Sequence, residues 1–147
     1  MRMGVLSMIA SDPIAVPVEG AARRGSRTAG TVCTSVAALF LAFDTILKVL
    51  RLDAAVQGTT SLGYPADTVL LIGIIELVCL VLYLVPRTSV LGALLMTGYL
   101  GGAIATHVRI SSPLLTHTLF PIYVALLLWG GLYLREPRLR ALVPFRS

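Results

Sequence analysis

Four ionisable side chains lie inside long apolar stretches of the sequence. Asp44 and Lys48 lie in the first of these stretches, Glu76 in the second and His107 in the third. A charged side chain at the centre of a bilayer costs about 2.5–3.5 kcal/mol on insertion scales, so such residues need partners and by default mark a functional site. Held together in an apolar interior, these groups can bind the polar part of a ligand or handle a proton.

Helical spacing indicates which of these side chains can meet. Asp44 and Lys48 are four residues apart and share one face of a helix. Glu76 has no opposite charge within its own stretch, so another helix, water or a proton must satisfy it. Tyr99 and His107 lie close to one stripe of the third stretch. We therefore predict a polar or ligand-binding cluster made of Lys48, Glu76, His107, Asp44, Tyr99, Thr106 and Arg109.

The same residues also allow a purely structural interpretation. Asp44 and Lys48 could neutralise each other within one helix, and Glu76 could carry a proton. The small residues Gly98 and Gly102 leave a similar choice, because they suit either close helix packing or a space for a flat ligand beside His107. The acidic and histidine side chains have no short ligand spacing such as H-E-x-x-H, so we predict no metal site.

Four apolar stretches must position these side chains. Each is close to the ~20 residues that a helix needs to cross a ~30 Å hydrocarbon layer. Pro121 falls within the last stretch and predicts a bend there. The sequence predicts an all-α integral membrane protein, a bundle of four transmembrane helices. The predicted spans are 32–50, 67–85, 90–108 and 114–134, with a polar turn segment at 57–67 and breaks at 86–88 and 111–113.

Composition supports a membrane location. Of 147 residues, 56% are apolar and 13% are charged, whereas an average soluble domain has about 25% charged residues. A soluble protein this small cannot cover its surface with so few polar residues, which argues against a soluble enzyme or a disordered regulator. The net charge of +5 comes from basic residues that flank the apolar stretches, so we expect a lipid bilayer as the partner and no nucleic acid.

Basic residues also predict the orientation. Four arginines precede the first stretch, Arg87 lies between the second and third, and four arginines follow the last. The positive-inside rule therefore places both termini in the cytoplasm. Residues 1–30 contain Pro, Gly, Ser and Arg without a period, which predicts a disordered N-terminal tail. We expect the transmembrane domain at 31–136 and a short basic C-terminal tail at 137–147.

Short motifs in this order resemble the DoxX-like family of small four-helix bacterial membrane proteins. The motifs are LGYP at 62–65, ELVCLVLYLVPRT at 76–88 and GGAIATHVR at 101–109, and the resemblance covers about 32–140. It implies a multi-pass protein of the bacterial cytoplasmic (inner) membrane. Named relatives are linked to quinone-coupled sulfur oxidation and to membrane-associated redox complexes. The resemblance carries over, as family positions, Lys48, Glu76, Gly102, Thr106, His107 and Arg109.

Three hypotheses for function follow. The first is a binding or accessory module that holds a quinone-like or other apolar small molecule, or docks a membrane-associated redox protein. Lys48 or His107 would then donate a hydrogen bond to a ligand carbonyl. The second is an intramembrane enzyme that uses Glu76 and His107 for acid–base work on a lipid-like substrate. The third is a purely structural membrane protein. The sequence does not decide whether the chain is an enzyme, and it leaves a homo-oligomer open.

Overall fold

The structure, a computed structural model, describes residues 18–137 and 139, with side chains described from residue 25 onward. This part of the chain is all-helical, as the sequence predicts. It comprises α1 (Val18–Val49), α2 (Asp53–Ser61), α3 (Thr68–Leu84), α4 (Ser89–Arg109), a π-helical segment η1 (Leu114–Thr118) and α5 (Phe120–Arg135).

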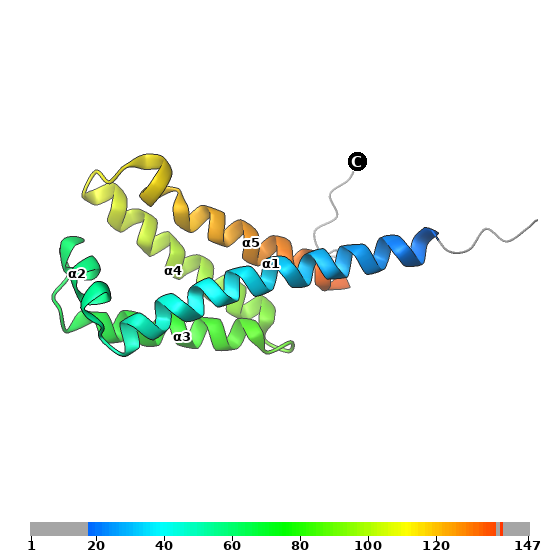
Figure 1. Ribbon diagram of the computed structural model, residues 1–147, viewed down its shortest axis with the longest axis horizontal. Coiled ribbons are helices and arrows are strands. Elements are labelled where there is room, and N and C mark those ends of the chain that lie inside the picture. The colour runs from blue at the N-terminus through cyan, green and yellow to red at the C-terminus, as the bar shows by residue number, and fades with distance from the viewer. Residues whose placement is uncertain (1–17, 138, 140–147) are drawn as a thin grey trace, which may run out of the picture.

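The long helices lie side by side and alternate in direction (Figure 1). Helix α1 packs against α3 and α5, and α4 packs against the same two helices from the other side. Helix α2 and η1 lie at one end of this arrangement, and the short connection at 85–88 lies at the other. We call the half of the molecule nearer α2 the α2 half, and the half nearer the 85–88 connection the turn half.

Helix boundaries agree well with the predictions where the apolar runs are uninterrupted. Helices α3 and α4 begin and end within one residue of the predicted spans. One expectation for another segment is wrong, because residues 57–61, expected in a polar turn, belong to α2. The last predicted span is divided into η1 and α5, and the break lies just before Pro121, which occupies the first turn of α5. Proline is tolerated there because the first helical N–H groups have no partner within the helix.

The N-terminal part of α1 is a second correction. The helix begins at Val18, so residues 18–30 are helical although the sequence predicted disorder. Packing against α5 supplies the stabilisation that composition does not reveal: a Cβ built on Gly30 would lie 2.8 Å from the Leu134 Cβ. Residues 1–17 of the expected tail, and most of the expected C-terminal tail at 137–147, lie outside the described residues.

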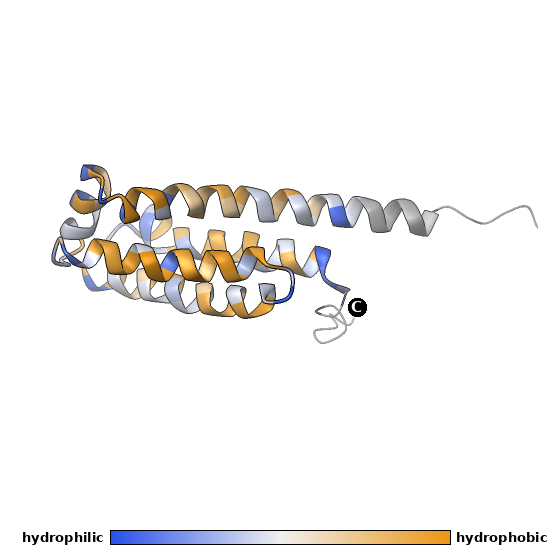
Figure 2. Cartoon of the chain, turned by 90° about the horizontal axis from the view of Figure 1, so that it is seen from below, coloured by the Kyte–Doolittle hydropathy of each residue, from blue (hydrophilic) through white to orange (hydrophobic). Residues whose placement is uncertain are grey.

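The outer surfaces of the helices have the character of membrane spans. Residues 25–49 in α1, α4, and 114–135 in η1 and α5 are long and apolar enough to cross a membrane. Helix α3 is also apolar but has 17 residues, a length of about 26 Å. Large side chains such as Leu39 (72% exposed) and Leu126 (66% exposed) lie on the outside of the bundle, and apolar residues are frequent along the long helices (Figure 2). Such a surface is stable in lipid and not in water.

The turn half is closely packed. Tyr83 and Met96 are fully buried there, and the Tyr83 hydroxyl donates a hydrogen bond to the Leu128 carbonyl at 3.0 Å. Glycines bring the backbones together: a Cβ on Gly92 would overlap the Tyr83 backbone nitrogen, and one on Gly131 would lie 2.5 Å from the Thr34 Oγ1. Small residues allow this approach because they add no side chain at the contact.

Candidate functional site

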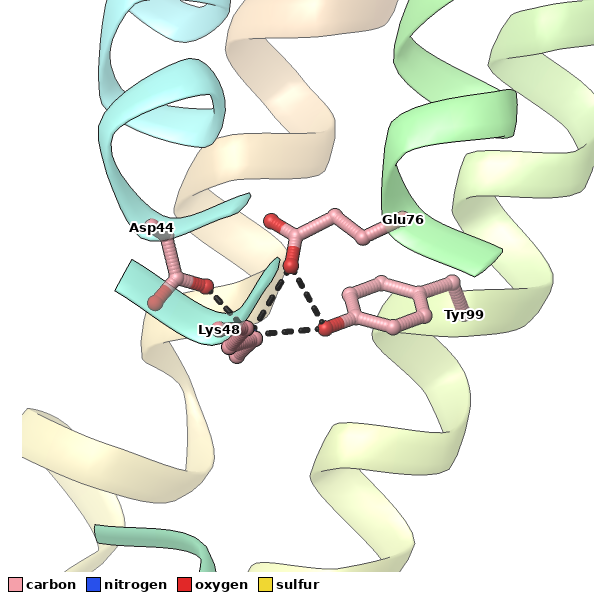
Figure 3. Close-up of polar contacts among 4 residues, drawn as sticks. All are labelled: Asp44, Lys48, Glu76 and Tyr99. Carbon is pink, nitrogen blue, oxygen red and sulfur yellow. Dashed lines mark hydrogen bonds and ion pairs between the residues drawn. The ribbon is translucent and has the colours of Figure 1, made fainter. Parts of the chain in front are cut away.

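A hydrogen-bonded cluster of four side chains joins α1, α3 and α4 in the α2 half (Figure 3). The Lys48 Nζ donates to the Glu76 Oε2 at 2.8 Å and to the Tyr99 hydroxyl at 2.8 Å. It also donates to the Asp44 Oδ2, one turn earlier on α1, at 2.5 Å. The Tyr99 hydroxyl in turn donates to the Glu76 Oε2 at 2.9 Å. We call these four residues the Lys48 cluster.

Close helix packing sets the geometry of the Lys48 cluster. Gly73 lies one turn before Glu76 on α3, and a Cβ there would lie 2.8 Å from the Lys48 Cβ. Helix α3 therefore approaches α1 directly beside the lysine. The Glu76 side chain is fully buried, whereas the Lys48 side chain is 16% exposed and that of Asp44 is 36% exposed. A buried charge of this kind requires paired partners from its neighbours, so the cluster ties three helices together.

One polar atom of the cluster has no partner. The Glu76 Oε1 is buried and accepts no hydrogen bond from the described residues. Figure 3 shows it on the side of the carboxylate away from Lys48 and Tyr99. Buried polar atoms in folded proteins are nearly always hydrogen-bonded, and an exception calls for an explanation.

A cavity of about 480 Å³ extends from the Lys48 cluster toward the α2 end. All four cluster residues line it, and Phe40 and Phe120 add aromatic walls. The two aromatic rings contact each other edge to face, with their centroids 5.1 Å apart. The cavity thus combines a polar end with apolar walls, which is typical of sites for small molecules.

The glycines of α4 form another wall of this cavity. Gly98 and Gly102 both line it, and a Cβ built on either would meet no heavy atom outside its own helix backbone within 4 Å. Of the two interpretations that the sequence allowed, the structure favours open space over close packing at these two positions. The glycines that make close backbone contacts are Gly30, Gly73, Gly92 and Gly131.

Thr106 and Arg109, both in the predicted cluster, contact the connection between α2 and α3 and not the Lys48 cluster, although Thr106 also lines the cavity. The Thr106 Oγ1 lies 2.8 Å from the Tyr64 hydroxyl, and the Arg109 Nη2 donates to the Leu62 carbonyl at 2.6 Å. The Arg109 guanidinium also lies over the Tyr64 ring, 5.8 Å from its centroid. These contacts hold the connection between α2 and α3 against α4. Leu62 and Tyr64 line the cavity, so they form its wall at the α2 end.

His107 lines the same cavity but belongs to a separate group. Its Nδ1 lies 3.0 Å from the Ser112 Oγ, and its ring centroid lies 5.8 Å from that of His117, which also lines the cavity. The predicted cluster therefore divides in two: Asp44, Lys48, Glu76 and Tyr99 are hydrogen-bonded together, whereas His107, Thr106 and Arg109 contact the segments nearer the α2 end. Over 18–137 and 139, no group of three or more His, Cys, Asp or Glu side chains is placed to hold a metal ion.

Several lining residues were not predicted from the sequence. Phe120 is an exposed apolar residue on a span, where nothing in the sequence separates a cavity wall from a lipid-facing surface. Phe40 carried a usable signal, because it lies one turn before Asp44 on the helix face of Asp44 and Lys48. Tyr64 carried a usable signal, because it belongs to the LGYP motif that supports the family resemblance. His117, near the outer end of the last span, is not among the predicted cluster residues, and its contact with His107 depends on the π-helical turn of η1.

Comparison with known proteins agrees with this description. A family model, the DoxX-like family, matches residues 32–131, more than half of the chain. The chain belongs to the DoxX-like family. The match includes the Lys48 cluster, Thr106, His107 and Arg109, and it begins within α1 after the helical extension at 18–31. No curated relative and no solved structure matches the chain significantly.

Proposed function

We propose that this protein is a membrane-embedded binding protein that holds a lipid-soluble small molecule with a polar head in the cavity of the α2 half. The observation that carries this proposal is the continuity of one cavity from apolar and aromatic walls to a buried charged cluster. Its volume, about 480 Å³, falls within the range of about 300–1,000 Å³ typical of small-molecule sites.

The proposal includes a membrane topology of four crossings with both termini in the cytoplasm. Helix α3 would be the fourth crossing, because it packs between α1 and α4 and is apolar along its length except at Glu76. Its length of about 26 Å is close to the hydrocarbon thickness of ~30 Å, and a bilayer thins by a few ångströms around a short span at modest cost. The Lys48 cluster would then lie near the middle of the bacterial inner membrane.

The ligand would reach the cavity from the bilayer, so it must be soluble in lipid. Quinone-like compounds belong to this class, and a membrane-associated redox protein would be the partner that uses such a ligand. A purely structural role requires a paired cluster and no cavity. Here the cluster is paired at Lys48, yet it adjoins a space that the described residues do not fill, which favours ligand binding over a purely structural role.

Mass spectrometry of material that copurifies with the protein tests the proposal. The wild-type protein is expected to retain a lipid-soluble compound that is enriched over bulk phospholipid. Gly102→Leu should lose it, because the new side chain enters the cavity.

Gly101→Leu is the matched control. Gly101 is the neighbouring residue on α4, and a Cβ there also meets no heavy atom within 4 Å, but it does not line the cavity. The control should retain the compound. If wild type and both variants yield the same phospholipids and nothing more, the protein has no ligand of this kind.

A further inference from the structure

The hydrogen-bond inventory of the Lys48 cluster defines what a ligand must supply. A lysine ammonium has three N–H donors and no acceptor. The Lys48 Nζ donates to the Asp44 Oδ2, the Glu76 Oε2 and the Tyr99 hydroxyl, so all three donors are used. The expectation that Lys48 donates to a ligand carbonyl therefore fails in this arrangement.

The hydroxyl proton of Tyr99 is also used within the cluster. A phenol has one O–H donor, and the Tyr99 hydroxyl gives it to the Glu76 Oε2 at 2.9 Å. Every proton that the Lys48 cluster can donate is thus accounted for within the cluster itself.

The remaining hydrogen-bonding capacity belongs to the carboxylates, which in their ionised form accept hydrogen bonds and donate none. Asp44 and Glu76 each use one oxygen to pair with Lys48. The second Glu76 oxygen has no hydrogen-bond partner among the described residues, but it is buried, so a ligand in the cavity does not reach it directly. The Asp44 side chain is 36% exposed and lines the cavity, so its carboxylate is the acceptor that a ligand meets first.

We infer that the cavity selects ligands whose polar head donates hydrogen bonds, a hydroxyl or an ammonium group, and discriminates against heads that only accept, such as a ketone, an ether or a quinone carbonyl. This inference rests on the proposed function and specifies its ligand. The Asp44 carboxylate accepts the hydrogen bond from the head, and the apolar walls hold the tail. For quinone-like compounds it assigns the reduced, hydroxyl-bearing form as the one bound.

A site built on hydrogen bonds rejects an analogue that leaves its buried groups unpaired. A hydrogen bond to a charged group corresponds to a difference of about tenfold or more in affinity. Four probes with the same alkyl tail separate the cases: para-octylphenol, para-octylbenzylamine, para-octylanisole and para-octylacetophenone. Isothermal titration into the full-length protein in detergent micelles, with protein-free micelles as the blank, measures the affinity of each.

The phenol, the amine or both are expected to bind at least about tenfold more tightly than the anisole and the acetophenone. Tighter binding of the amine would indicate that the site recognises the charge of the head. Tighter binding of the phenol would indicate that it recognises a neutral hydrogen-bond donor. Equal binding of all four probes would overturn the inference and leave the proposed function standing. Failure of every probe to bind wild type more tightly than Gly102→Leu would overturn the proposed function itself.

Two variants change the hydrogen-bonding groups that the Lys48 cluster offers to a ligand. Asp44→Asn exchanges a carboxylate oxygen for an N–H donor at nearly the same shape, so the preference for the phenol over the acetophenone should be lost or reversed. Tyr99→Phe leaves one Lys48 N–H without its acceptor, so acetophenone should gain affinity. An unchanged preference in both variants, each confirmed as folded by circular dichroism, would show that the Lys48 cluster does not read the head.

Discussion

Near the 85–88 connection α4 approaches α3 until a glycine touches the neighbouring backbone, whereas near α2 the same helix borders a cavity of about 480 Å³. Gly92 on α4 abuts the backbone of Tyr83. Gly102, almost three turns further along the same helix, faces open space. One helix therefore uses the same residue type for two opposite purposes.

The difference teaches how each half is stabilised. In the turn half, van der Waals contact between close backbones stabilises the packing of the helices. In the α2 half, α3 also contacts α1 closely at Gly73, but hydrogen bonds from Lys48 to Glu76 and Tyr99 connect the helices beside the cavity. Such a network holds helices at a fixed separation without filling the space beside it. The comparison predicts that the α2 half is sensitive to lost charge, and the turn half to added volume.

The largest effect is expected from Glu76→Ala. It removes the acceptor shared by Lys48 and Tyr99 and leaves a buried ammonium paired with Asp44 alone. Breaking a buried ion pair by removing one partner costs about 3–5 kcal/mol. Reversible unfolding in detergent gives the free energy, and Glu76→Gln, which keeps an oxygen acceptor, should lose less. A wild-type stability for Glu76→Ala would mean that charge pairing does not hold the α2 half together.

Gly92→Ala should have the next largest effect. The added methyl would overlap the Tyr83 backbone nitrogen, and backbone cannot move aside as a flexible side chain can. Overpacking of this kind costs about 1–3 kcal/mol. Gly101→Ala on the same helix is the control: a Cβ there meets no heavy atom within 4 Å, so the variant should match wild type or gain up to about 1 kcal/mol from helix propensity. Similar losses in both variants would remove the contrast between the halves.

Tyr83→Phe should have a moderate effect. The change removes the hydroxyl that contacts the Thr34 Oγ1 at 3.3 Å and the Leu128 carbonyl at 3.0 Å, while the ring keeps its packing. Loss of a neutral hydrogen bond costs about 1 kcal/mol. The same unfolding measurement applies. A loss as large as that of Glu76→Ala would indicate that the turn half also depends on a polar network.

Arg109→Ala should have the smallest effect on stability, at most about 1 kcal/mol, because Arg109 is exposed and its hydrogen bond competes with water. Its expected effect is local. Residues 62–64 lose one of their attachments to α4, so their backbone amides should exchange hydrogen for deuterium faster, as mass spectrometry of peptides would measure. Unchanged exchange at 62–64 would show that the Thr106–Tyr64 contact alone fixes this wall.

The apolar spans were predictable because each is bounded by polar residues or proline. Helices α3 and α4 illustrate this, since Pro86 follows one and Arg109 closes the other. Helix α2 was not predictable, because its Gly58 and two threonines have low helix propensity and its position depends on the neighbouring segment. Pattern alone also does not reveal that residues 18–30 extend α1 beside the end of α5.

The site was predictable to the extent that helical geometry fixes it. The i,i+4 spacing pairs Asp44 with Lys48, and the need of Glu76 for a partner on another helix points to the lysine. The separation of His107 and Arg109 from this cluster follows from connections at 62–64 and 111–113, whose paths no periodicity predicts. The roles of individual glycines were not predictable either, because glycine suits both a close contact between helices and the wall of an open space.

The open glycines of α4 also bear on how variants of this protein respond to selection. A glycine in a helix interior costs about 0.5–1 kcal/mol relative to alanine, and at Gly98 and Gly102 no packing contact within the chain requires it. A screen for heat-resistant variants would therefore enrich larger residues at both positions. The selected variants would be more stable and would have a smaller cavity. Selection for stability at these two positions of α4 therefore acts against retention of the cavity.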